Sequence, residues 1–146
     1  MNLTSKQRKV ALGILMLIAI SLIVFDIIAK PYIDEYNAKD RIVKEFAEEI
    51  AQEKARIPFK INSTLNLINI QQDRLHITYI YQALYKTADE INTHTPEEYY
   101  TPAQQADNCQ YYKGYVLLGL VIDYVYLDKN GKWVFTKSVD KASCKL

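Results

Sequence analysis

The sequence predicts an α+β fold, in which an N-terminal transmembrane helix precedes a small α-β-β-α-β-β domain with a mainly antiparallel sheet. Three observations lead to this prediction. Residues 10–29 form one long apolar run. Two later pairs of strand-like segments are each joined by a short polar turn, as in antiparallel hairpins. Helical spacing or helix-capping residues occur before the first pair and between the two pairs.

The apolar run at 10–29 contains a single charged residue, Asp26. A helix of this length covers about 30 Å, the thickness of the hydrocarbon core of a bilayer. We therefore expect residues 10–29 to contact membrane lipid, between a cytoplasmic tail at 1–9 and an α+β domain at 30–146. Because Asp26 lies near the end of the span, we expect it to reach headgroup water rather than to serve a function inside the membrane.

Two alternatives to a transmembrane anchor are open. A cleaved signal peptide has an apolar region of roughly 7–15 residues that ends in a small-x-small site. Here the apolar run continues past Ala19-Ile20-Ser21, and Ile27 and Ile28 disfavour cleavage just after them. A soluble helix that is apolar on every face would need a larger core than the rest of the chain supplies. The anchor is the better interpretation.

The charges that flank the run leave its orientation nearly balanced. Basic residues lie on both sides of it: Lys6, Arg8 and Lys9 before, and Lys30, Lys39, Arg41 and Lys44 after. A long C-terminal domain is translocated largely regardless of charge, and a cysteine pair suits an oxidising compartment. We therefore predict a protein of the bacterial inner (cell) membrane with its N-terminus in the cytoplasm and its domain in the periplasm.

The charge of the domain argues against nucleic acid as a partner. The chain has 18 basic and 17 acidic side chains, and the first thirty residues hold four of the former and one of the latter. The domain therefore carries 14 basic and 16 acidic side chains, interspersed along the sequence. A nucleic-acid footprint would need a clustered basic face.

The domain is expected to begin with an amphipathic helix at 33–57, between Pro31 and Pro58. Its apolar residues recur at helical spacing: Ile42, Val43, Phe46, Ala47, Ile50 and Ala51. Such a stripe must be buried, and its expected partner is the sheet that follows, with a second subunit as the alternative.

The sheet and a further helix are expected within 60–146. The first hairpin joins strands at 64–70 and 75–85 through a turn at 71–74, and a polar loop follows at 86–95. In the second of these strands, Leu75, Ile77, Tyr79 and Tyr81 share one face. Residues 120–127 and 132–139 form the other hairpin, with Gly131 at the left-handed position of the turn that starts at Asp128.

Two successive helix-start signals precede that second hairpin. Thr95-Pro96-Glu97-Glu98 and Thr101-Pro102-Ala103-Gln104 both place a threonine at the N-cap, a proline at the first helical position and an acidic or amide residue at the third. We expect a short turn and then a helix from Pro102 to about Tyr112 that carries Cys109.

Cys109 and Cys144 are the only two cysteines, and we predict that they form a disulfide. An even number of cysteines in a translocated domain is typical of small folds that gain stability from a cross-link. Two unpaired buried thiols are the plainer alternative. A zinc site with His76 and His94 is a third, but the spacing of these four residues matches no known zinc pattern.

The domain resembles a group of small membrane-anchored or exported bacterial proteins that have no assigned activity. The matching features are Pro58-Phe-Lys-Ile-Asn-Ser-Thr64-Leu65, Tyr79-Ile-Tyr81, Cys109, Gly119-Leu-Val-Ile-Asp-Tyr124-Val-Tyr126-Leu-Asp128-Lys-Asn-Gly131 and Cys144. These are turn glycines, strand tyrosines and paired cysteines. The resemblance therefore implies an α+β fold and a disulfide, and it implies no active site.

The sequence holds little that predicts catalysis, so we expect no enzyme and no cofactor or metal. His76 with Asp73 as an orienting partner is the best hydrolase candidate, but a strand histidine that faces solvent or a tyrosine is the simpler interpretation. With four glycines in the chain, no phosphate-binding loop is present.

Tyrosine is the unusual component, with 12 Tyr against four Phe. Five of them gather around the predicted helix and form a possible contact patch: Tyr99, Tyr100, Tyr111, Tyr112 and Tyr115. Ordinary packing of amphipathic tyrosines around a short helix is the plainer interpretation. The leading functional hypothesis is a protein-interaction or assembly domain that binds another envelope protein or a second copy of the chain. An envelope immunity or phage-exclusion protein is the alternative.

Overall fold

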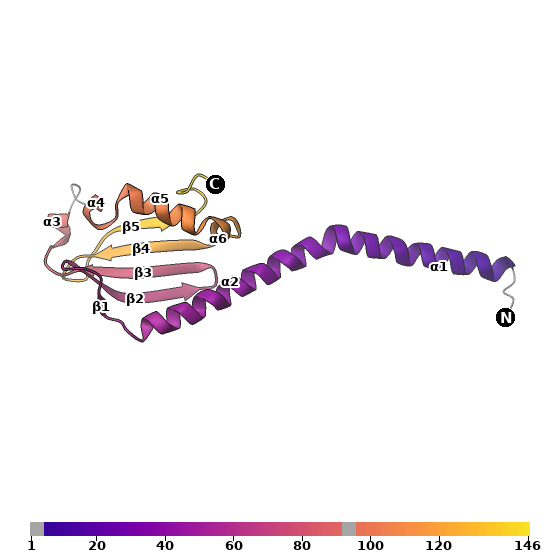
Figure 1. Cartoon of the computed structure of the whole chain (residues 1–146), viewed down its shortest axis with the longest axis horizontal. Coiled ribbons are helices and arrows are strands. Elements are labelled where there is room, and N and C mark those ends of the chain that lie inside the picture. Colours follow the sequence, from indigo (N-terminus) through magenta and orange to yellow (C-terminus); the bar gives the residue numbers. More distant parts are fainter. Residues whose placement is uncertain (1–4, 92–95) are drawn as a thin grey trace. The chain divides into compact units, whose positions relative to one another are not determined.

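The computed structural model describes residues 5–91 and 96–146 (Figure 1). The chain divides into two compact units, Met1–Ala38 and Lys39–Leu146. Helix α1, Ser5–Val24, opens the first unit; a short π-helical segment, Phe25–Ala29, and helix α2, Lys30–Lys54, follow it along the chain.

Within residues 13–38, the first unit exposes many apolar side chains. Leu17 is 69% exposed and Ile27 is 68% exposed, so no protein core covers this surface. Among the described residues, one helix is apolar enough and long enough to cross a membrane, with a mean hydropathy of 2.3 in its most apolar stretch. Length and composition alone define this candidate, and signal sequences share both, so the membrane anchor stays a prediction.

Pro31 explains the π-helical turn that precedes α2. Proline has no N–H to donate to the carbonyl of Ile27, four residues earlier, and its ring crowds that carbonyl. The backbone N–H of Lys30 bonds instead to the carbonyl of Phe25, five residues back. A wider turn of this kind is the usual response to a local break in the α-helical ladder.

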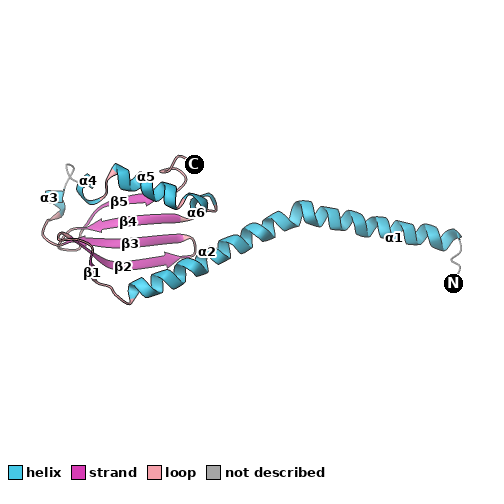
Figure 2. Cartoon of the chain, viewed as in Figure 1, coloured by secondary structure: helices cyan, strands magenta, loops and turns pink. Residues whose placement is uncertain are grey.

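The second unit contains a five-stranded sheet in the order β1-β2-β3-β4-β5 (Figure 2). The strands are β1, Phe59–Lys60; β2, Leu65–Asp73; β3, His76–Ala83; β4, Val121–Leu127; and β5, Trp133–Val139. Neighbouring strands are antiparallel except for β3 and β4, which are parallel. The predicted α+β fold with a mainly antiparallel sheet and two hairpins is confirmed. The short edge strand β1 was not predicted.

The parallel pair requires a long crossover from β3 to β4, and this crossover is helical. Its helices are α3, Ala88–Ile91; α4, Pro96–Tyr99; α5, Pro102–Tyr111; and α6, Lys113–Leu117. The predicted helix from Pro102 is confirmed, and so is its capping box. The Thr101 N–H donates to Gln104 Oε1 at 2.7 Å, and the Gln104 N–H donates to Thr101 Oγ1 at 3.1 Å. Thr95, the first predicted N-cap, lies outside the described residues.

The prediction of a polar loop at 86–95 is wrong for its first half. Residues 88–91 form α3, and Ile91 at its end is only 2% exposed. Helix α3 begins here because Thr87 and Glu90 cap its N-terminus by bonding to each other. The backbone N–H of Thr87 donates to Glu90 Oε2 at 2.7 Å, and the Glu90 N–H lies 3.4 Å from Thr87 Oγ1.

The first hairpin turn is tighter than predicted. Strand β2 continues to Asp73, so only Arg74 and Leu75 remain in the turn, with Arg74 at a φ of 53°. Gln72, predicted as a turn residue, instead donates from Nε2 to the carbonyl of Val43 in α2 at 3.1 Å. The second turn is as predicted, with Gly131 at a φ of 81°.

One hydrophobic core fills the second unit. Residues Ile42, Phe46 and Ile50 of α2 are buried, as the predicted stripe requires, although Ala47 and Ala51 are exposed. The ring of Phe46 contacts the rings of Tyr112 and Tyr115, so this part of α2 and the α5–α6 segment pack over the same face of the sheet.

Candidate functional site

A groove of about 380 Å³ lies on the helix-covered face of the sheet. One wall is the segment between β1 and β2, and the other is α5 with the residues just before it. We call it the tyrosine groove, because five of its eleven lining residues are tyrosines: Ile61, Asn62, Leu65, Tyr81, Tyr99, Tyr100, Gln104, Asp107, Asn108, Tyr124 and Tyr126.

The floor of the groove follows from strand geometry. Alternate residues of a strand point to the same face, so β3 presents Tyr79 and Tyr81 while β4 presents Tyr124 and Tyr126. The parallel register aligns Tyr79 with Tyr124 and Tyr81 with Tyr126. The rings of these pairs stack with centroids 5.7 Å and 5.2 Å apart. Two adjacent strands therefore form a continuous aromatic surface.

Polar contacts hold the far wall against this floor. The amide of Asn108 donates from Nδ2 to the hydroxyl of Tyr100 at 3.0 Å. The hydroxyl of Tyr126 donates to the backbone carbonyl of Tyr99 at 3.3 Å. Because a buried phenol needs a hydrogen-bond partner, these contacts fix the position of the segment that leads into α5.

The tyrosines of the floor are neutral at physiological pH. Burial raises the pKa of Tyr81 well above its ordinary value, and the charge of Glu53 raises it further. The same two causes act on Tyr79. For Tyr124, burial again dominates, with the neighbouring phenols adding to the effect. The floor therefore consists of uncharged phenols whose rings stack on one another, and it does not supply a phenolate.

Glu53 of α2 is a carboxylate whose charge raises the pKa values of Tyr79 and Tyr81. Its Oε2 is buried and accepts no hydrogen bond within the described part of the chain. Burial raises the pKa of Glu53, as does the charge of Glu49 one turn earlier, while Arg56 lowers it. Glu53 is not one of the residues that line the groove, and one oxygen of its carboxylate has unused hydrogen-bonding capacity.

The five tyrosines of the predicted contact patch lie in different environments. Tyr99 and Tyr100 are 9% and 5% exposed and belong to the core and the groove wall. Tyr112 and Tyr115 are partly buried against Phe46, and Tyr111 is 76% exposed. The structure does not bring all five onto one exposed surface. A contact role for the more exposed members stays a prediction.

The sequence analysis named Tyr124 and Tyr126 of β4 only as strand tyrosines and did not assign them to a site, although they complete the groove floor. The alternation of tyrosines in both strands was visible. The parallel pairing of β3 with β4, which sets these rings beside Tyr79 and Tyr81, could not be predicted from the sequence.

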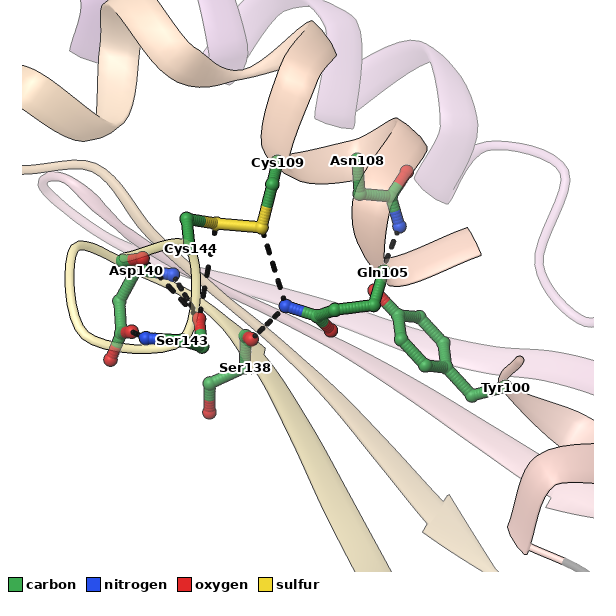
Figure 3. The surroundings of a disulfide bond; sticks show 8 residues. All are labelled: Tyr100, Gln105, Asn108, Cys109, Ser138, Asp140, Ser143 and Cys144. Atoms are coloured by element: carbon green, nitrogen blue, oxygen red, sulfur yellow. Dashed lines mark hydrogen bonds between the residues drawn. A yellow bond between two sulfur atoms is a disulfide. The ribbon is translucent and has the colours of Figure 1, made fainter. Parts of the chain in front are cut away.

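Cys109 of α5 and Cys144 after β5 form a disulfide in the structure, with Cα atoms 5.4 Å apart (Figure 3). This distance is within the ordinary range. The amide of Gln105 donates from Nε2 to the carbonyl of Ser138 at 3.0 Å and lies 3.4 Å from Cys109 Sγ. The cross-link and this amide together tie α5 to the end of β5. Since α5 is a wall of the groove, they also support the groove.

The disulfide leaves no thiolate for the zinc alternative, because no described cysteine is free. His94 lies outside the described residues. No group of three or more His, Cys, Asp or Glu side chains within residues 5–91 and 96–146 is arranged to hold a metal ion.

His76 is half exposed on β3, and its partner is not Asp73, which the hydrolase alternative required. Its Nε2 lies 2.8 Å from Oδ2 of Asp123 on β4, so Asp73 is not the orienting residue. Ser138 of β5 donates its hydroxyl hydrogen to the other oxygen of Asp123. In a catalytic triad the hydroxyl bonds to the imidazole, with the carboxylate on its far side. Here both groups bond to the carboxylate, an arrangement that links three strands across the outer face of the sheet.

No protein-family model matches the chain, and no curated protein matches its sequence. Solved structures share its fold. A Pseudomonas aeruginosa protein assigned provisionally as secreted is 15% identical with a TM-score of 0.54, over 73% of this chain and 95% of that protein. The pilotin EpsS of the Vibrio vulnificus type 2 secretion system is 15% identical with a TM-score of 0.53, over 74% and 96% of the two chains.

The pilotin AspS of the Vibrio cholerae type II secretion system is 14% identical with a TM-score of 0.51, over 75% of this chain and 98% of that protein. At such identities the likeness shows the fold alone. That fold agrees with the expected resemblance to small exported bacterial proteins.

Proposed function

We propose that this chain is a single-pass protein of the bacterial inner membrane whose periplasmic domain binds another envelope protein through the tyrosine groove. The observation that carries the proposal is the groove itself. It is lined by neutral, stacked phenols and supported by a disulfide-linked helix, so it is formed before any partner arrives.

The chemistry of the groove suits a protein partner. Tyrosine is enriched in protein interfaces because its ring provides contact area while its hydroxyl tolerates water. A volume of about 380 Å³ accommodates a few side chains of a bound segment. Its neutral phenols and single exposed carboxylate, Asp107, provide no nucleophile paired with a base.

The likeness to two pilotins supports an assembly role in preference to an enzymatic one. The apolar first unit supports an anchor, and the disulfide supports an oxidising compartment. Together these features support a binding event at the outer face of the inner membrane.

Two tryptophan variants test the role of the groove. Ile61 is 44% exposed in the groove wall, so Ile61→Trp fills the groove without disturbing the core. Gln71, an exposed residue of β2 whose side chain lies on the outer face of the sheet, provides the matched control Gln71→Trp. Full-length protein tagged after Leu146 is recovered from intact cells with a cleavable cross-linker. We expect wild type and Gln71→Trp to retain a partner that Ile61→Trp loses. Equal recovery from all three would contradict binding through the groove.

A second experiment tests the compartment. Alkaline phosphatase fused after Leu146 folds and is active only outside the cytoplasm, whereas green fluorescent protein fused there is fluorescent only inside it. We expect an active phosphatase fusion and a dark fluorescent fusion. The reverse pattern would place the domain in the cytoplasm.

A further inference from the structure

We infer that the free edge of β5 binds an extended segment of a second protein, which adds to the five-stranded sheet as a further strand. This surface is separate from the tyrosine groove, with which it shares only the lining residue Tyr100. Three features of the edge point to such a partner: open backbone groups, a cleft beside them and an exposed tryptophan.

Strand β5 is one edge of the sheet, and β1 is the other (Figure 2). β1 has only two residues, whereas β5 has seven. An unpaired edge presents a row of N–H and C=O groups on which another chain can form a strand. β5 is therefore the longer edge available for such pairing.

The register shows which backbone groups of β5 point away from the sheet. The N–H of Val121 donates to the carbonyl of Leu75, so Val121 and every second residue after it in β4 bond to β3. The alternate residues of β4 therefore bond to β5, and their partners there include Lys137. The backbone groups of the two neighbours of Lys137, Thr136 and Ser138, consequently point outward.

These outward groups are filled at one end of β5 and open before it. The carbonyl of Ser138 accepts the side-chain amide of Gln105 (Figure 3), and residues 143–144 bond to both backbone groups of Asp140. In the described part of the chain, no hydrogen bond reaches the N–H or carbonyl of Thr136 or the N–H of Ser138. Two donors and one acceptor therefore stand in a row, as an added strand requires.

A cleft of about 370 Å³ lies along this stretch of the edge. Thr136, Lys137 and Ser138 form one wall, and the other includes Glu97 and the first turn of α5. Glu97 and Lys137 carry the only formal charges among the lining residues, and these charges are opposite in sign. The lining thus has no net charge to select a charged ligand, which suits a partner that is bound chiefly through its main chain.

The position of α5 favours a single extended chain over a second copy of the domain. Gln105 of α5 reaches the outward-facing carbonyl of Ser138, so α5 extends over the edge of the sheet. If two β5 strands paired antiparallel about a two-fold axis, the helices of both copies would lie on the same face. The two α5 helices would then meet over the seam. A single extended segment brings no helix and avoids this contact.

Trp133 provides contact area at the open end of β5. It is 60% exposed, and its Nε1 donates to Thr136 Oγ1 at 3.1 Å. The side chain of Trp133 therefore lies along β5, next to the open backbone groups of Thr136. A side chain of an added strand can pack on this ring while its main chain bonds to the edge, and tryptophan is among the residues that contribute most to protein binding.

A photo-cross-linker in the cleft wall captures the segment. The full-length chain carries p-benzoylphenylalanine at position 97, an exposed site, in intact cells, and mass spectrometry identifies the adduct. We expect a segment of a second protein. The same probe at position 71, on the outer face of β2, should not give that adduct. Ile61→Trp, which fills the tyrosine groove, should leave the yield at position 97 unchanged.

Amide hydrogen exchange then tests whether the captured segment pairs as a strand. A synthetic peptide of that sequence is added to full-length protein in detergent, and exchange is followed by NMR. The amides of Thr136 and Ser138 should exchange more slowly by roughly 10-fold or more when the peptide is bound. Lys137 is the internal control, because its N–H bonds to β4 and should exchange slowly with and without the peptide.

N-methylation of the peptide tests the same contact without altering the protein. Every second residue of an added strand directs its N–H toward β5. Methylation at those positions should weaken binding by roughly 10-fold or more, whereas methylation at the residues between them should not, because the loss of one main-chain hydrogen bond and the added bulk affect only the edge-facing positions.

Several results would overturn the inference and leave binding through the tyrosine groove intact. They are the absence of an adduct at position 97, an adduct with a second copy of this chain, and an equal yield of the adduct from position 71. Unchanged exchange at Thr136 and Ser138 with the peptide bound, or an equal effect of N-methylation at every position, would also contradict strand addition at β5.

Discussion

The carboxylate of Asp128 accepts a hydrogen bond from the backbone N–H of Ala88, forty residues earlier in the chain, at 3.0 Å. The same side chain accepts the backbone N–H groups of Asn130 and Lys132, both at 2.8 Å. Asp128 is only 2% exposed. One buried side chain therefore closes the β4–β5 turn and also holds the start of α3.

We predict that Asp128→Asn lowers the stability of the domain, because an amide cannot accept three N–H groups as a carboxylate does. Although burial opposes its charge, the backbone donors hold the pKa of Asp128 below its ordinary value of 3.8. A lowered pKa gives stability that is present above 3.8 and is lost as the pH falls through the folded value. Urea midpoints of full-length protein in detergent should differ between wild type and variant at neutral pH and converge in acid. Asp89→Asn, at an exposed site in α3, is the control and should match wild type.

Removal of the disulfide should destabilise the domain by about 2–5 kcal/mol. The cross-link spans 35 positions and ties α5 to the chain after β5, so its loss increases the entropy of the unfolded chain. Thermal unfolding of Cys144→Ala, Cys109→Ala and the double variant should show nearly equal losses, because each change removes the same bond. Unequal losses would mean that the remaining thiol has an effect of its own. Non-reducing peptide mapping that finds two free thiols in native protein would contradict the bond.

The tyrosines of the core should resist ionisation. Burial is the main cause that raises the pKa of Tyr112 to about 12, from an ordinary value of 10.0. Burial raises the pKa values of Tyr79, Tyr81 and Tyr124 further. Since these folded values exceed the unfolded one, their contribution to stability is complete below pH 10 and is lost as the pH rises through the folded values.

An ultraviolet titration of tyrosinate checks this expectation. Native protein should form fewer tyrosinates just above pH 10 than protein in denaturant, and the rest should ionise together as the domain unfolds. Identical titration curves with and without denaturant would show that the tyrosines are not buried.

Phe46→Ala should cost about 3–5 kcal/mol of folding stability, as truncation of a buried phenylalanine generally does. Phe46 is 5% exposed, and its ring centroid lies 5.3 Å from that of Tyr115 and 6.2 Å from that of Tyr112. The loss should appear in the denaturant midpoint of the second unit. Glu48→Ala, at an exposed site on the same helix, should change stability by less than about 0.5 kcal/mol.

Short sequence patterns correctly predicted those elements that depend on contacts between residues close together in the chain. The capping box at Thr101 and the left-handed glycine at 131 both act within a few residues, and both are present in the structure. The capping arrangement at Thr87 is equally local, but the polar residues around it suggested a loop. Sequence patterns therefore identified the hairpins and α5, and missed α3.

The candidate site depends on contacts between distant segments, and these could not be predicted. The groove forms because β3 pairs in parallel with β4, which aligns Tyr81 with Tyr126. Hairpin signals do not specify how two hairpins join. The pairing of His76 with Asp123, 47 residues apart, has the same origin. The sequence predicted two links between distant segments, the disulfide and the packing of the apolar stripe of α2 on the sheet.

Site-specific photo-cross-linking in intact cells tests the central proposal most directly. The probe is placed at Ile61 in the groove wall or at Gln71 on the outer face of the sheet, both in the full-length chain. Binding of an envelope protein through the tyrosine groove predicts an adduct with a second protein from position 61 and none from position 71. Adducts of equal yield from both positions, or none from position 61, would contradict the proposal.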